Sequence, residues 1–144
     1  MWCFNRNKKK TVKPNIIWLD ETDSTNNYLK NYVPASDEKI SVVVADYQKA
    51  GRGQGENTWE SEPGKNLLFS ILVHPVMVPV HCQFLLSMAE ALALKEVLDK
   101  YTDGITLKWP NDIYWNDKKI GGTLIETTLG GGHIKNCIFG TGID

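Results

Sequence analysis

Four strand-like segments follow one another closely between Ile105 and Ile143, in the sequence ITLKWPNDIYWNDKKIGGTLIETTLGGGHIKNCIFGTGI. The turn 116–118 joins the segment 112–115 to the segment 119–127, and three glycines at 130–132 then return the chain into a strand over 133–143. Short connections of this kind join antiparallel strands, whereas parallel strands need a crossover of a dozen or more residues. The stretch therefore predicts a sheet built of adjacent hairpins.

The chain before residue 105 adds further strands and a short helix. Apolar and partly β-branched runs predict buried strands at 16–19, 40–45 and 66–74. Asp23-Ser24-Thr25 offers N-cap side chains and predicts a short helix that ends by Lys30.

A longer helix is predicted over 81–101. Large apolar residues recur there near a 3.6-residue period, which predicts that they lie in the core: Phe84, Leu85, Met88, Leu92 and Leu98. One long helix among mostly adjacent strands predicts an α+β fold, with a mixed, mainly antiparallel sheet and helices packed on one face. The last strand ends the chain, so we expect it to lie at an open edge of the sheet.

Composition narrows the class of protein. The chain has 144 residues, which suits one domain or most of one, over 14–144, after a polar, basic and disordered tail at 1–13. A net charge of −1 argues against nucleic acid as a partner. No apolar run approaches the roughly 18 residues of a membrane span. Three scattered cysteines fit free thiols in a cytoplasmic protein.

Two segments carry residues suited to an anionic ligand. Gly51-Arg52-Gly53-Gln54-Gly55 places a guanidinium fork beside backbone N–H groups that a ligand can approach closely, and Trp59 can then close over an apolar ring. Lys108-Trp109-Pro110-Asn111-Asp112 sets a cation, an amide and a carboxylate around a proline. Together they predict a site for an anionic small molecule and a nucleotide.

Five blocks in this order resemble the catalytic domain of biotin protein ligases, a family with a class II aminoacyl-tRNA synthetase and biotin synthetase-like fold. The resemblance runs from about Ile16 to Asp144, and its blocks are Ser24-Thr25-Asn26, Gln48-Lys49-Ala50-Gly51-Arg52-Gly53-Gln54 with Trp59, Lys108-Trp109-Pro110-Asn111-Asp112, Lys119-Ile120-Gly121-Gly122 and Leu124-Ile125-Glu126. It implies that biotin and Mg-ATP give biotinyl-5′-AMP, whose biotin is then transferred to a lysine of a biotin carboxyl carrier domain.

The resemblance also implies a role for each matching residue. The residues implied for biotin binding are Ser24, Thr25, Gln48, Gly51, Arg52, Gly53 and Leu124. Lys119, Arg52 and Lys108 correspond to the catalytic cations. The nucleotide end corresponds to Trp59, Asn111, Asp112 and Asp144, with Asp112 as the residue that binds Mg²⁺.

The chain departs from the family pattern at three points. Gln54 stands where some members have a second arginine, and Asp144 stands where an asparagine usually reads adenine. No further helices or C-terminal barrel follow, which predicts a C-terminally truncated domain. The alternatives are a lipoate or octanoate ligase of the same superfamily and a non-catalytic, biotin-binding or dimerising fragment. Homodimer contacts are expected around 119–126 and the glycine loop.

Overall fold

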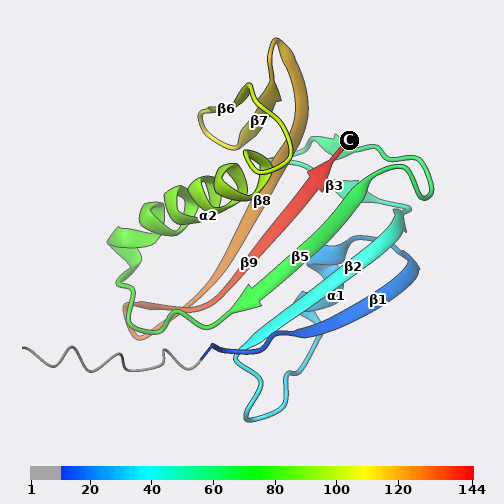
Figure 1. Ribbon diagram of the computed structural model, residues 1–144. Coiled ribbons are helices and arrows are strands. Elements are labelled where there is room, and N and C mark those ends of the chain that lie inside the picture. Colours follow the sequence, from blue (N-terminus) through cyan, green and yellow to red (C-terminus); the bar gives the residue numbers. More distant parts are fainter. Residues whose placement is uncertain (1–10) are drawn as a thin grey trace, which may run out of the picture.

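A single mixed sheet of seven strands organises the computed structural model, which describes residues 11–144 (Figure 1). Residues 1–10 of the predicted tail lie outside this range. The strand order is β1-β2-β5-β9-β8-β7-β6. The bounds are β1 Asn15–Thr22, β2 Ile40–Gln48, β5 Leu67–Val73, β6 Ile105–Lys108, β7 Asp112–Trp115, β8 Lys118–Gly130 and β9 His133–Ile143. Only β1 and β2 pair in parallel, so the predicted mixed, mainly antiparallel sheet is confirmed.

The last strand does not lie where the sequence placed it. β9 is paired on both sides, with β5 and with β8, and is therefore central in the sheet. Its alternating residues are apolar on both faces, as befits a strand covered on two sides: Ile138 packs on one face, and Cys137 and Phe139 pack on the other. The prediction of an open edge at the end of the chain was wrong.

The short helix α1, Thr25–Lys30, begins where the sequence predicted. The Ser24 hydroxyl accepts a hydrogen bond from the backbone N–H of Asn27 at 3.4 Å and caps the helix. Leu29 then packs with Val43 of β2, Leu72 of β5 and Ile138 of β9. This contact fixes the last turn of α1 against the middle of the sheet.

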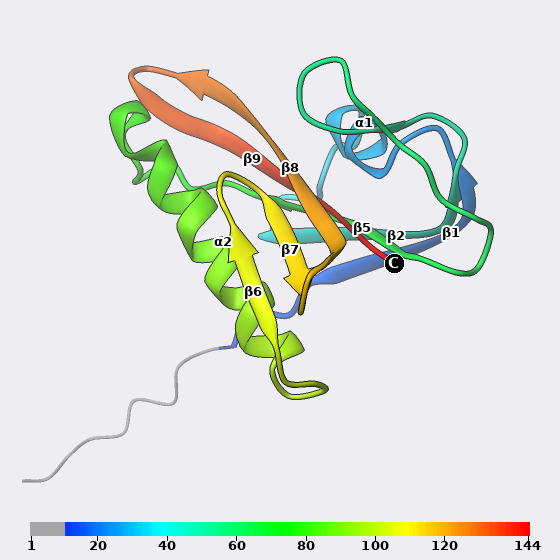
Figure 2. The ribbon, with the colours of Figure 1, turned by 90° about the horizontal axis from the view of Figure 1, so that it is seen from above.

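The long helix α2, Gln83–Leu98, follows a 3₁₀ turn (η1, Val80–Cys82) and covers the opposite face. Its Leu86 packs with Cys137 and Phe139, whereas α1 contacts the other face of β9. Figure 2 shows the two helices on opposite sides of this strand. The expectation that helices pack on one face is thereby corrected.

The apolar stripe predicted for α2 is not buried. Four of its residues are between 43% and 60% exposed, namely Phe84, Leu85, Met88 and Leu92. The sequence is apolar on more than one side of this helix, and the contact with the sheet uses Leu86 instead.

No helix within residues 11–144 is long and apolar enough to cross a membrane.

A polar cluster around Glu38 holds the connection between α1 and β2. Its carboxylate accepts hydrogen bonds from the Ser41 hydroxyl at 2.6 Å, from Asn15 at 3.1 Å and from the Tyr32 hydroxyl at 2.9 Å. These bonds, that of Ser41 first, lower the pKa of Glu38 to about 2. The cluster ties β1 to the end of the connection and to the start of β2.

The lowered pKa predicts a pH dependence of stability. Since the pKa of Glu38 is depressed on folding, its stabilising contribution is present above the unfolded pKa of about 4.5 and is lost as pH falls toward 2. We expect Glu38→Gln to be less stable than the wild-type chain at pH 6, and the difference to shrink toward pH 2. Urea unfolding at several pH values measures this; a difference that stays constant from pH 6 to pH 2 would contradict it.

The two described cysteines differ in environment. Cys137 is buried, and burial together with the charge of Glu90 raises its thiol pKa to about 12. Cys82 is a partly exposed free thiol. The thiolate is the reactive form of cysteine, so a buried thiol with a pKa raised this far reacts slowly at pH 8. Iodoacetamide at pH 8 is therefore expected to modify Cys82 and spare Cys137 in the folded chain, as mass spectrometry of peptides would show; equal labelling would refute this.

Candidate active site

A cavity of about 480 Å³ opens on the α1 face of the sheet. It lies among the start of α1, the end of β2, the segment 52–59, the turn between β6 and β7, and the strands β8 and β9. Ten of the residues predicted for the site line it: Ser24, Thr25, Gln48, Arg52, Gly53, Trp59, Asn111, Asp112, Lys119 and Leu124. The structure thus brings together residues from segments nearly 100 positions apart.

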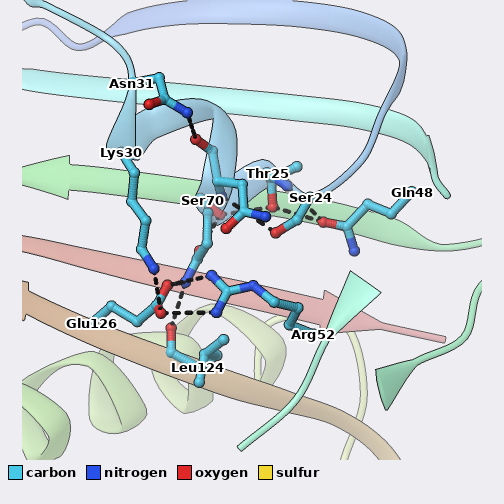
Figure 3. A network of polar contacts seen from close by, with 11 residues as sticks. Ser24, Thr25, Lys30, Asn31, Gln48, Arg52, Ser70, Leu124 and Glu126 are labelled. Carbon is cyan, nitrogen blue, oxygen red and sulfur yellow. Dashed lines mark hydrogen bonds and ion pairs between the residues drawn. The ribbon is translucent and has the colours of Figure 1, made fainter. Parts of the chain in front are cut away.

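One wall of the cavity is a connected set of buried polar groups (Figure 3). Gln48 Oε1 accepts from the backbone N–H of Thr25 at 2.8 Å and from its hydroxyl at 3.0 Å. Ser70 Oγ lies 2.7 Å from Thr25 Oγ1 and 2.6 Å from Asn26 Oδ1, while Asn26 Nδ2 donates to the Leu124 carbonyl at 3.2 Å. Because Asn26 Oδ1 can only accept, the single hydroxyl hydrogen of Ser70 is donated to it. The one hydroxyl hydrogen of Thr25 serves either Gln48 Oε1 or Ser70 Oγ. The contacts fix the wall in position.

The glycine loop closes the cavity as a small hairpin. Gly51–Arg52 (β3) pairs with Thr58–Trp59 (β4), and Gly51 lies opposite Trp59. A Cβ on Gly51 would meet the Trp59 carbonyl oxygen at 2.3 Å, so the close pairing requires glycine at this position. Gly51 itself shapes the loop without lining the cavity.

Two glycines of β9 complete the site, and the sequence analysis did not assign them. A Cβ on Gly140 would lie 2.1 Å from Asn26 Oδ1, and one on Gly142 would lie 2.5 Å from Trp59 Cε2. Both glycines therefore make room for a side chain that crosses the strand. The signal was available, since isolated glycines inside a strand often mark a close approach by another group.

A charged pair lies at the other end of the cavity. Lys119 Nζ is 2.9 Å from Asp112 Oδ1, and both side chains are partly exposed. No group of three or more metal-ligating side chains occurs within residues 11–144. Mg²⁺ nevertheless often binds to one or two carboxylates and completes its shell with substrate phosphates and water. The second oxygen of Asp112 fits that limited role.

Besides Gly51, the structure leaves two predicted site residues outside the cavity. Lys108 lies over the ring of Tyr114, 5.3 Å from its centroid, and lines a second cavity of about 270 Å³ beside α2. Asp144 donates its backbone N–H to the Ile120 carbonyl at 2.8 Å, and its carboxylate is hydrogen-bonded by Asn66. Neither residue lines the first cavity.

Comparison with known proteins assigns the family. A sequence model of the biotin/lipoate A/B protein ligase family matches residues 18–144. The chain belongs to this family. The bifunctional ligase/repressor BirA of Salmonella typhimurium is 35% identical over 131 residues, which are 90% of this chain and 40% of that protein. The chain thus spans about 40% of the length of such curated relatives.

Solved structures confirm the fold that the resemblance implied. The biotin acetyl coenzyme A carboxylase synthetase from Helicobacter pylori, with bound biotinylated ATP, matches with a TM-score of 0.73 and 28% identity, over 92% of this chain and 61% of that one. The biotin protein ligase from Leishmania major in complex with biotinyl-5-AMP matches with a TM-score of 0.69 and 33% identity, over 92% and 57%. These family members have the class II synthetase-like architecture predicted from the motifs.

Proposed function

We propose that this chain carries the catalytic site of a biotin protein ligase, which activates biotin with ATP to biotinyl-5′-AMP and transfers it to a lysine of a biotin carboxyl carrier domain. The observation that carries the proposal is the single cavity that joins the Thr25–Gln48 wall to the Lys119–Asp112 pair. Relatives named as biotin protein ligases support it.

The polar wall suits the ureido ring of biotin. That ring has two N–H donors and one carbonyl acceptor, so it needs acceptors and a donor at fixed positions. Ser24 and Thr25 supply hydroxyl oxygens, and Gln48 is held through its Oε1, which leaves its amide N–H groups for the ring carbonyl. A buried group left unpaired costs about 1–3 kcal/mol, so the wall selects a polar ring over the apolar dithiolane ring of lipoate.

The first chemical step takes place at the opposite end. One oxygen of the biotin carboxylate attacks the α-phosphorus of ATP, the bond to the β-phosphate bridging oxygen breaks, and pyrophosphate leaves with the bonding electrons. Lys119 lines this end of the cavity, and we propose that its positive charge offsets the charge that develops on the phosphate oxygens. Mg²⁺, held through Asp112, would offset phosphate charge when bound. Trp59 and Asn111 line the same region and are proposed for the nucleotide.

In the second step, the amine of the acceptor lysine attacks the activated carbonyl carbon. The acyl–oxygen bond breaks, AMP leaves, and an amide forms with loss of a proton from the amine. This step requires no covalent bond to the protein, so positioning of the adenylate carries the catalysis.

Titration of the 144-residue chain with biotin, followed by an assay of pyrophosphate release with biotin and Mg-ATP, tests the function. Heat of biotin binding with biotin-dependent pyrophosphate release is the expected result. Binding without release would instead support the non-catalytic biotin-binding alternative. Absence of biotin binding, together with binding of lipoate, would favour the lipoate ligase alternative.

A homodimer is also proposed, through the outer edge of β8. This strand pairs with β7 only up to Gly122, whereas its pairing with β9 continues to Gly130. The stretch from 124 to 130 therefore has no strand partner on its other side among residues 11–144, and such an edge is open to pairing with a second copy. Sedimentation that shows a monomer at every concentration would refute this.

A further inference from the structure

Glu126 on β8 is the centre of an ion cluster that the proposed chemistry does not use. Its carboxylate accepts two hydrogen bonds from the Arg52 guanidinium, at 3.0 Å from Nη1 and 2.7 Å from Nη2. Lys30 of α1 donates to it at 2.7 Å, and Asn26 donates at 3.0 Å. Figure 3 shows Glu126 between the ends of Lys30 and Arg52. One carboxylate therefore joins the glycine loop, α1 and β8.

The hydrogen bonds of the cluster stabilise the ionised form of the Glu126 carboxyl. Partial burial would raise the pKa of Glu126, but the hydrogen bonds from Arg52, Lys30 and Asn26 outweigh it and lower the pKa to about 2. A two-bond fork between a guanidinium and a carboxylate also fixes the orientation of the arginine plane, which a single contact cannot do.

The pairing with Glu126 leaves one guanidinium nitrogen unused. Arg52 lines the cavity, and its Nε is buried without a hydrogen-bond partner in the described part of the chain. Nη1 and Nη2 each donate one of their two hydrogens to Glu126. A buried donor without an acceptor is unfavourable, so this N–H is suited to an acceptor that a ligand brings.

We propose that Glu126 is a positioning residue, which holds Arg52 by both terminal nitrogens so that its Nε–H is presented in a fixed direction to an oxygen of the bound acid. Arg52 would then contact the ligand without leaving Glu126. The identity of that acid as biotin rests on the proposed function, whereas the positioning itself does not. Lys30 and Asn26 hold the carboxylate from α1.

The positioning is tested first on the ligand-free chain. The sequence contains two arginines, Arg6 and Arg52, so the Nε–H signal of Arg52 can be assigned in an NMR spectrum by its loss in Arg52→Lys. Glu126→Gln keeps the size of the side chain and removes its charge, and is expected to speed exchange of this hydrogen with water by about tenfold or more. Glu62→Gln, in an exposed pair with Lys65, is the matched control and should leave the signal unchanged. Unchanged exchange in Glu126→Gln would overturn the proposal.

Biotin titration then tests the effect on the ligand. Glu126→Gln is expected to weaken biotin binding by about tenfold, and to have no further effect in an Arg52→Met background. Tighter binding, or equal weakening in both backgrounds, would show that Glu126 does not act through Arg52 and would overturn the proposal. The wild-type chain could bind no biotin while Glu126→Gln still speeds exchange of the Arg52 Nε hydrogen. In that case the positioning role stands and the proposed function fails.

Discussion

Replacing Lys119 with methionine is expected to lower the rate of biotin-dependent pyrophosphate release by ~10²–10³-fold. Lys119 is the cation of β8 that lines the cavity, and methionine keeps much of its unbranched stem while removing the charge. The substitution also removes the cation that lies 2.9 Å from the carboxylate of Asp112. This carboxylate would then repel the incoming phosphate. A coupled pyrophosphate assay at saturating ATP measures the change.

The adjacent lysine provides the control for this experiment. Lys118 is exposed and lies opposite Trp115 in the pairing of β7 with β8, outside the cavity. Lys118→Met should therefore release pyrophosphate at close to the wild-type rate. Asp112→Asn distinguishes the role of the carboxylate from that of the cation. It should raise the Mg²⁺ concentration needed for activity, whereas Lys119→Met should not. Similar rates in Lys118→Met and Lys119→Met would remove Lys119 from the reaction.

The hairpin turns of this fold could be predicted from the sequence because a turn depends on the residues within it. Asn116 and the glycines 131 and 132 have positive φ, which these residues adopt more readily than others, and they end strands where the sequence indicated. The order of β1, β2, β5 and β9 could not be predicted in this way. An apolar run shows that a strand is buried but does not name its partner, so the central place of β9 and the two covered faces became visible only in the structure.

The same distinction holds for the site. Thr25, Gln48 and Asp112 were proposed because their motifs occur in a familiar order, and they do line one cavity. Lys108 was proposed on the same basis, yet successive residues of a strand point to opposite faces, and a motif does not say which face is which. Glu126 lay in a quoted block, but its partners Arg52 and Lys30 are distant in sequence and are set by tertiary packing.

Gly140→Ala is expected to abolish measurable biotin binding and to destabilise the chain by about 1–3 kcal/mol. The added Cβ would lie 2.1 Å from Asn26 Oδ1 and 2.7 Å from its Cγ, well inside contact distance. Asn26 is only 3% exposed. A change of its rotamer would break its hydrogen bonds with Ser70 and Leu124. Titration with biotin and urea unfolding measure the two effects.

Two further variants identify Asn26 as the cause. Gly130→Ala places a Cβ no closer than 3.8 Å to Lys135 and lacks a positive φ, so it should bind biotin and unfold like the wild-type chain. Asn26→Ala removes the atoms that the new Cβ would meet. If crowding of Asn26 is the mechanism, Gly140→Ala should cost far less stability in the Asn26→Ala background than in the wild-type chain, because the two changes share one contact. An equal cost in both backgrounds would mean that Gly140 is required for its own backbone and not for the side chain that crosses it.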